Sequence, residues 1–318
     1  MRNIAPRSLG FGAANLGNLH HRLSDEQAFA VLETAWDSGI RYFDTAPHYG
    51  LGLSERRLGE FLRSKPRNEY TISTKVGRLL RTDPAWSGEL DTENDFVVPA
   101  NLQRVWDASP SGIRQSVDES LERLGLDRVD IIYLHDPERY GLETSLATGI
   151  PSLVTLRDEG IVSRVGVGSM SLDALEASAR TGALDILMAA GRYTLAETQT
   201  PDFLLDECQK NDVDVVVASV FNSGLLASAS PSEGSLYDYG PVPVDILRRV
   251  REIASVCREY DVELPAAALQ FPLRSDVVDT VMVASATPFH IAQNVAWAAT
   301  PIPVELWDEL IERHLIPN

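Results

Sequence analysis

Residues 129–134 read Val-Asp-Ile-Ile-Tyr-Leu, and residues 213–218 read Val-Asp-Val-Val-Val-Ala. Both runs are rich in apolar and β-branched residues, and neither shows the strict alternation that marks a strand with one face in water. Strands of this kind are typical of parallel sheets that are covered on both faces. The two runs therefore predict an α/β protein built around a buried parallel sheet.

Similar runs recur along the 318-residue chain, with longer amphipathic stretches between them. The predicted strands lie near residues 8–12, 42–46, 70–76, 129–135, 163–169, 185–190, 213–221 and 278–284. Eight units of a strand followed by a helix are typical of a closed (β/α)8 TIM barrel. The alternative is a doubly wound sheet, but Gly10-Phe11-Gly12 and Gly166-Val167-Gly168 both lack the third glycine of that fold's dinucleotide-binding turn. We predict one barrel domain over residues 1–318.

Local signals mark several helix boundaries and two long loops. Ser24 to Gln27 form a capping box, which predicts a helix that continues to Gly39. Thr200-Pro201 and Thr287-Pro288 each place a capping hydroxyl before a proline, as at the start of a helix. Residues 78–110 and 222–243 are longer than a barrel needs, and we expect both to be long loops at the C-terminal face, where the strands end.

The composition excludes several classes of partner. The chain has 28 basic and 46 acidic residues, and its net charge of −18 disfavours nucleic acid and anionic membranes. It has no apolar run long enough for a membrane span and no signal-peptide pattern. Cys208 and Cys257 lack the spacing of a disulfide or a zinc site, which favours a reducing cytoplasm. Only His20 and His21 cluster, so we expect no metal site. Nothing in the sequence specifies an oligomeric state.

Four polar residues lie at or just after the predicted ends of three apolar strands. Asp44 ends the second strand, Tyr49 follows it, Lys75 ends the third and His135 ends the fourth. We call these residues the tetrad. Because active sites of barrels lie at the C-terminal ends of the strands, we expect the four side chains to meet there.

The residue types of the tetrad indicate carbonyl and alcohol chemistry. A buried Lys75 needs a carboxylate partner, and Asp44 is one strand away. A nearby ammonium lowers the pKa of a phenol, so Lys75 would make Tyr49 a usable proton donor and acceptor. His135 could hold the substrate oxygen. A lysine at the end of a strand is also how Schiff-base aldolases present their nucleophile, although Asp44 would keep Lys75 charged.

The tetrad and its flanking residues resemble those of the aldo-keto reductase superfamily. Phe43-Asp44-Thr45-Ala46-Pro47-His48-Tyr49-Gly50, followed by Ser54-Glu55 and Leu58-Gly59, is similar to that family's signature, and the likeness covers nearly the whole chain. It implies a nicotinamide-dependent oxidoreductase. In that mechanism the tyrosine exchanges the proton, the lysine–aspartate pair adjusts the acidity of the tyrosine, and the histidine orients the substrate. Some relatives are cofactor-sensing subunits with little turnover, and that alternative stays open.

The resemblance also implies where a nicotinamide cofactor binds. Residues 282–294 align with the family's cofactor segment, and a helix N-terminus at Thr287 is suited to a phosphate. The implied cofactor-binding residues are Ser169, Phe221, Asn222, Ser223, Gly224, Leu225, Ser285, Thr287, His290, Gln293 and Asn294. Relatives that use NADP have a lysine and an arginine where this chain has Ala284 and His290, so NAD is favoured over NADP.

Three further motifs are similar to the branch of D-threo-aldose (L-fucose) 1-dehydrogenases, with pyridoxal 4-dehydrogenases as close relatives. They are the Ala-Pro-His-Tyr-Gly form of the signature, residues 221–224 and residues 191–194. This likeness implies oxidation of the C1 hydroxyl of an aldose to a lactone; pyridoxal oxidation or general aldehyde reduction are the alternatives. Residues that could form the pocket for such a small-molecule substrate are Asn15, His48, Arg78, Trp86 and Trp106.

Overall fold

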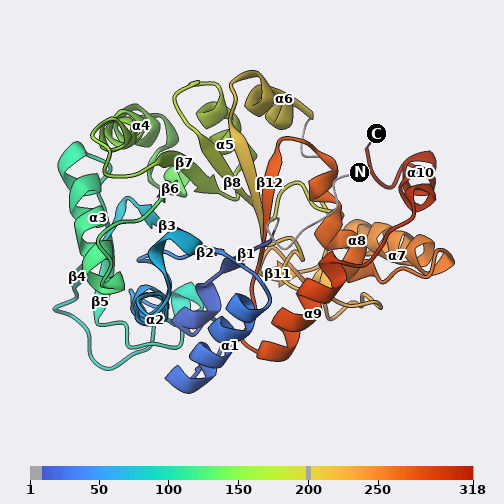
Figure 1. The fold of residues 1–318 in the computed structure, drawn as a ribbon, viewed down its shortest axis with the longest axis horizontal. Coiled ribbons are helices and arrows are strands. Elements are labelled where there is room, and N and C mark those ends of the chain that lie inside the picture. Colours follow the sequence, from blue (N-terminus) through green and yellow to red (C-terminus); the bar gives the residue numbers. More distant parts are fainter. Residues whose placement is uncertain (1–8, 198–201, 318) are drawn as a thin grey trace.

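The computed structural model describes residues 9–197 and 202–317, and its centre is a closed barrel of eight parallel strands (Figure 1). Around the barrel the strands follow one another in the order β1 (Leu9–Gly12), β12 (Val278–Val283), β9 (Asp214–Ala218), β8 (Ile186–Ala190), β7 (Arg164–Ser169), β6 (Ile131–His135), β3 (Thr71–Val76) and β2 (Tyr42–Asp44). Each of the eight predicted strands contains one of them. The predicted (β/α)8 barrel is confirmed.

Helices surround the barrel and connect its strands (Figure 1). They are α1 (Asp25–Asp37), α2 (Leu53–Leu62), α3 (Pro110–Leu124), α4 (Leu142–Asp158), α5 (Leu172–Ala179), α6 (Asp202–Lys210), α7 (Val244–Glu259), α8 (Leu264–Gln270), α9 (Pro288–Ala298) and α10 (Val304–Glu312). Two helices, α7 and α8, lie between β9 and β12, and α10 follows α9, so the pattern exceeds one helix per strand. None of the described helices is long and apolar enough to cross a membrane.

The predicted helix boundaries are confirmed where the structure describes them. Ser24 caps α1 through the amide of Gln27, whose side chain bonds back to Ser24, and Gly39 takes the left-handed conformation that ends the segment (φ 87°). Thr287 caps α9, with Pro288 at its first position. Thr200-Pro201 lies outside the described residues.

The interior of the barrel is closed by side chains. Tyr42 and Tyr133 are buried there and join through their hydroxyls at 2.9 Å, and they pack with Ile131, Met188 and Met282 among others. Because the lumen is filled, a substrate can reach the strands only at their ends.

The strand register brings the tetrad together. Asp44 at the end of β2 is paired with Ser73 of β3, and Lys75 of β3 is paired with Tyr133 of β6, two residues before His135. β2, β3 and β6 are neighbours in the barrel, so the ends that carry Asp44, Lys75 and His135 share one part of its rim.

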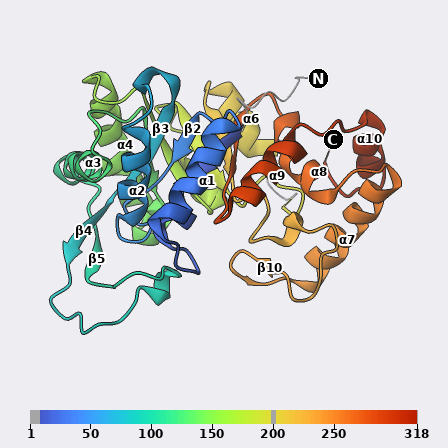
Figure 2. The ribbon, with the colours of Figure 1, turned by 60° about the horizontal axis from the view of Figure 1, so that its bottom comes forward.

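The two long segments are not simple loops, which corrects that prediction. Residues 78–110 contain an antiparallel pair, β4 (Arg78–Thr82) and β5 (Leu102–Trp106), and residues 222–243 contain the short pair β10 (Leu236–Tyr237) and β11 (Gly240–Pro241). Their strands are short and largely exposed or half-buried, so their sequences lack the apolar runs of the barrel strands. Figure 2 shows both segments on the same side of the molecule.

The close packing of α2 on α3 depends on Gly59. A Cβ atom added at this position would lie 2.0 Å from the backbone oxygen of Leu124, at the end of α3. Gly59→Ala should therefore lower the free energy of unfolding by about 1–3 kcal/mol, because backbone atoms cannot yield as a flexible side chain does.

Urea unfolding of the two proteins measures this loss. Gly234→Ala is the matched control, since Gly234 is exposed and the nearest atom to an added Cβ is 3.8 Å away. Equal midpoints for Gly59→Ala and Gly234→Ala would contradict the packing argument.

Candidate active site

A buried ion pair forms the base of the site. Lys75 Nζ donates to Asp44 Oδ2 at 2.5 Å and to the carbonyl of Thr45 at 3.0 Å, and Ser73 Oγ donates to Asp44 Oδ1 at 2.7 Å. Both ionic side chains are almost fully buried. Burial acts to lower the pKa of Lys75 and is the largest single effect, but the charge and hydrogen bond of Asp44, together with those of Tyr49, outweigh it and raise that pKa above its ordinary value. The expected partnership of Asp44 and Lys75 is present, and Lys75 is an ammonium.

Tyr49 lies above this pair. Lys75 Nζ is 4.8 Å from the centre of the Tyr49 ring. The backbone at Tyr49 and Gly50 is held by close contact with Gly17, because a Cβ on Gly50, whose φ is 60°, would come within 2.2 Å of the Gly17 oxygen. Gly17 ends η2 (Ala14–Gly17), a short 3-10 turn after β1. The η2 turn therefore restricts the position of the Tyr49 side chain.

The acidity of Tyr49 differs from the expectation. Burial raises the pKa of its phenol to about 12, and the opposing effect of Lys75 only partly offsets this. The predicted lowering of that pKa is wrong for the protein alone. Loss of water around the phenolate destabilises it more than the charge of Lys75 stabilises it. At neutral pH Tyr49 is therefore a proton donor.

Two histidines flank Tyr49, of which His135 is buried and His48 is half-buried. The ring centre of His135 lies 6.0 Å from that of Tyr49 and 5.7 Å from that of His48. Burial lowers the pKa of both imidazoles, to about 2 for His48, and the positive charge of Arg78 adds to the effect. His48 Nδ1 is buried and has no hydrogen-bond partner within residues 9–197 and 202–317. Both side chains are thus neutral, and His48 carries an unsatisfied buried nitrogen beside the tetrad.

Of the residues named for the substrate, Arg78 and Trp106 also lie beside the site, paired with each other across β4 and β5. Arg78 donates to Asp136, the residue after His135, at 2.5 Å, and Trp106 stacks on Tyr140 with ring centres 4.2 Å apart.

Asn15 lies in η2, half-buried. Trp86 lies at an exposed turn of the segment between β4 and β5, where its indole donates to the carbonyl of Glu89. The structure therefore does not bring Trp86 to the tetrad.

The remaining signature residues act as supports. Glu55 is fully buried and accepts hydrogen bonds from Thr74, which precedes Lys75, and from Arg123 of α3. Ser54 bonds to Thr45 and to the carbonyl of Ala13. These contacts tie α2 to the strand ends that carry Asp44 and Lys75.

The residues implied for a cofactor lie at or after the ends of β7, β9 and β12. Ser169, Ser285 and Asn294 are buried polar residues, whereas Thr287, at the N-terminus of α9, and His290, in its first turn, are exposed. Gln293 is half-buried on the same helix. Hydroxyl and amide groups beside an exposed helix N-terminus match the amide and phosphate groups of a nicotinamide dinucleotide.

The loop after β9 fits such a cofactor less simply. Phe221 lies edge-on to Trp297 of α9 at 6.3 Å, and Asn222 is buried, accepts from Thr194 and donates to the carbonyl of Gly191. The amides of Gly224 and Leu225 donate to the carbonyls of Phe221 and Asn222 within the loop. Asn222 therefore has a structural role, and neither of these two amides is a free donor. Gly224 itself is exposed, and no atom of the described part of the chain lies within 4 Å of an added Cβ.

Sequence reasoning missed Tyr239, which lies in the turn between β10 and β11. Its ring centre is 6.5 Å from that of His20, and its phenol interacts electrostatically with Tyr49. Burial raises the pKa of this phenol as well. Its distance of 190 positions from Tyr49 in the chain left no local signal to connect the two.

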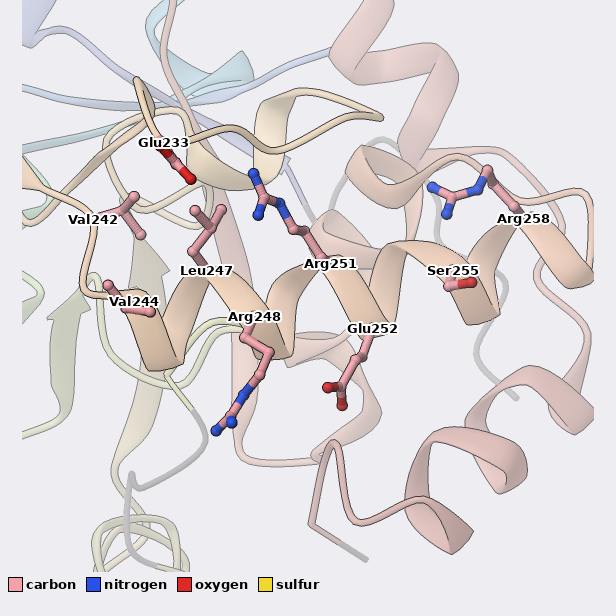
Figure 3. Close-up of a pocket in the computed structure, with 9 residues that line it drawn as sticks. All are labelled: Glu233, Val242, Val244, Leu247, Arg248, Arg251, Glu252, Ser255 and Arg258. Carbon is pink, nitrogen blue, oxygen red and sulfur yellow. The ribbon is translucent and has the colours of Figure 1, made fainter.

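A separate groove of about 610 Å³ runs along α7 (Figure 3). Its lining residues are Glu233, Val242, Val244, Leu247, Arg248, Arg251, Glu252, Ser255 and Arg258. It shares no residue with the tetrad, so the chemistry of the tetrad does not involve it.

Comparison with known proteins agrees with this geometry. The sequence pattern of the aldo/keto reductase family matches residues 8–313. The chain is 54% identical to a D-threo-aldose 1-dehydrogenase of Pseudomonas sp. over 99% of its own length and 96% of the relative, and 37% identical to a pyridoxal 4-dehydrogenase of Microbacterium luteolum over 97% and 94%.

A solved structure shows the same fold. The aldo-keto reductase AKR11C1 from Bacillus halodurans, in its holo form, superposes with a TM-score of 0.75 at 25% identity, covering 97% of this chain and 92% of the other. The barrel, the matched family pattern and the close relatives lead to one conclusion: the chain belongs to the aldo/keto reductase family and is an oxidoreductase.

Proposed function

We propose that this enzyme oxidises the C1 hydroxyl of an aldose to a lactone, with a bound nicotinamide dinucleotide as the other reactant. The observation that carries the proposal is the phenol of Tyr49, held above the buried Lys75–Asp44 pair and beside the neutral His135. The identity of 54% to a D-threo-aldose 1-dehydrogenase supports the choice of substrate class.

Each member of the tetrad has one task in this proposal. His135 donates a hydrogen bond to the reacting oxygen, and Tyr49 takes the proton from that oxygen or returns it in the reverse direction. Lys75, kept charged by Asp44, stabilises the phenolate form of Tyr49 when the proton has left. When bound, the nicotinamide supplies the hydride acceptor. His48 Nδ1, Arg78, Trp106 and Asn15 would hold the sugar.

For the cofactor, we propose that Ser169, Ser285, Gln293 and Asn294 provide polar contacts, that Phe221 packs on the nicotinamide, and that the N-terminus of α9 at Thr287 meets a phosphate. Ser223, Gly224 and Leu225 would line the pyrophosphate after a local rearrangement. Ala284 and His290 are both exposed where a second ribose phosphate would need cations, which supports NAD over NADP. Cys208 and Cys257 are free and buried, which supports a reducing cytoplasm.

Pyridoxal oxidation is a second candidate, supported by the relative at 37% identity and by the stacked Trp106 and Tyr140, whose rings suit an aromatic substrate. Schiff-base chemistry is disfavoured, because that reaction needs a neutral lysine and Asp44 keeps Lys75 charged. Assays with NAD and NADP against L-fucose, D-arabinose, L-galactose, pyridoxal and simple alcohols separate these activities. Absence of turnover with every aldose would overturn the proposal.

Tyr49→Phe should reduce kcat by about 100-fold or more, since the hydroxyl exchanges the proton of the reacting oxygen. Cofactor binding, measured by quenching of tryptophan fluorescence, should stay within about twofold of the wild type, because the phenol does not hold the cofactor. Tyr260→Phe, on the distant end of α7, is the matched control. Full activity of Tyr49→Phe would exclude this residue as the acid and base.

The rate of oxidation should rise with pH. Below about pH 12 Tyr49 is mostly protonated, and only the phenolate can accept a proton, so kcat/KM for oxidation should rise by up to about tenfold per pH unit between pH 7 and 9. Carbonyl reduction needs the protonated phenol and should show no such rise. Steady-state rates in both directions test this, and a flat profile for oxidation would assign the base role to another group.

Ala284→Lys combined with His290→Arg should shift cofactor use toward NADP. The two cations would pair with the extra phosphate, and kcat/KM for NADP relative to NAD should rise by about tenfold or more. Ala284→Gln with His290→Gln is the control for side-chain size without charge. If both double variants change the ratio equally, charge at these positions does not determine the choice.

A further inference from the structure

The turn between β10 and β11 brings Tyr239 to the mouth of the barrel. Its ring lies 6.5 Å from that of His20, which follows β1, whereas the turn belongs to the segment after β9. The two residues meet although 219 positions separate them in the sequence. Tyr239 therefore links two of the segments that rise above the strand ends.

The neighbours of the phenol place it on the side of the tetrad. Tyr239 hydrogen-bonds with Ser219, just after β9, and interacts electrostatically with Asp95, with Asp136 and with Tyr49 itself. Asp136 directly follows His135 and pairs with Arg78. The phenol thus lies near the groups proposed to hold and convert the substrate.

The backbone of the turn is held in an unfavourable conformation. Asp238 and Tyr239 have φ values of 47° and 65°, in the left-handed region where hairpin turns normally carry asparagine or glycine. Two bonds of 2.9 Å hold the turn: Arg192 donates to Asp238, and the amide of Tyr239 donates to Ser223 Oγ. Tyr239 is nevertheless 52% exposed, so its ring is not needed to fill a core. A bulky residue in such a conformation, with much of its surface uncovered, is free to contact a ligand.

We propose that Tyr239 is a specificity-determining residue for cyclic polyols: its ring packs on the C–H face of the sugar, and its hydroxyl bonds to a sugar hydroxyl away from C1. This inference rests on the proposed aldose oxidation. It adds a contact to the one proposed for His48, whose buried Nδ1 has no hydrogen-bond partner among the described residues. Under this proposal a small aldehyde needs only Tyr49 and His135 and makes no contact with Tyr239.

The test compares Tyr239→Ala, Tyr239→Phe and the control Tyr260→Phe with an aldose and with acetaldehyde. In Tyr239→Ala, KM for L-fucose should rise by about tenfold, because both the stacked ring and the hydroxyl bond are lost, while kcat should stay within about twofold. Tyr239→Phe keeps the ring and should raise KM by about threefold. For acetaldehyde, and for cofactor binding by fluorescence, the variants should match the wild type.

The outcomes separate this inference from the function on which it rests. A wild-type protein without turnover of any aldose overturns both. Wild-type turnover with an unchanged KM in Tyr239→Ala overturns the inference alone, as does an equal loss for acetaldehyde, which would indicate a general structural effect. Thermal unfolding of each variant within about 2 °C of the wild type shows that the fold is intact, as expected for a half-exposed side chain.

Discussion

The proposed chemistry depends on one buried contact, the ion pair of Lys75 with Asp44. A buried ammonium at the end of an apolar strand stays charged only with a partner. Here Lys75 donates to the carboxylate of Asp44 and to the carbonyl of Thr45, and the hydroxyl of Ser73 donates to the same carboxylate. Removing either ion would leave the other buried and unpaired. Much of the signature motif supports this pair, since Glu55 and Ser54 fix the strand ends and Gly50, in the signature, packs against Gly17.

Much of the fold could be predicted because a covered parallel strand has a distinctive composition. The runs 129–134 and 213–218 are mostly apolar because both faces of the sheet are covered. Eight such runs in the sequence predicted a barrel. The pairs β4–β5 and β10–β11 were not predicted, since short strands of two to five residues that are not covered on both faces follow no such rule. The same holds for α8, a helix of seven residues whose burial depends on its neighbours.

Part of the site could likewise be predicted from the sequence, and part could not. Asp44, Lys75 and His135 could be placed from sequence because strand ends in a barrel must converge, and Tyr49 because it follows closely. The pKa of Tyr49 could not be predicted, since it depends on how completely the surrounding loops exclude water from the phenol. Trp86 was misplaced and Tyr239 overlooked for one shared reason: the path of a long segment over the rim is decided by tertiary contacts.

The closed strand order has a consequence for how the chain can fold. β1 pairs with β2 on one side and with β12 on the other. The second pairing joins residues near position 10 to residues near position 280. All four residues of the tetrad are synthesised by position 135, yet the rim that holds them is complete only when this long-range pairing forms. Pairings between such distant segments are slow to form, so a growing chain would carry the reactive groups well before it could use them. Catalytic competence therefore requires the pairing of β1 with β12, which closes the cylinder.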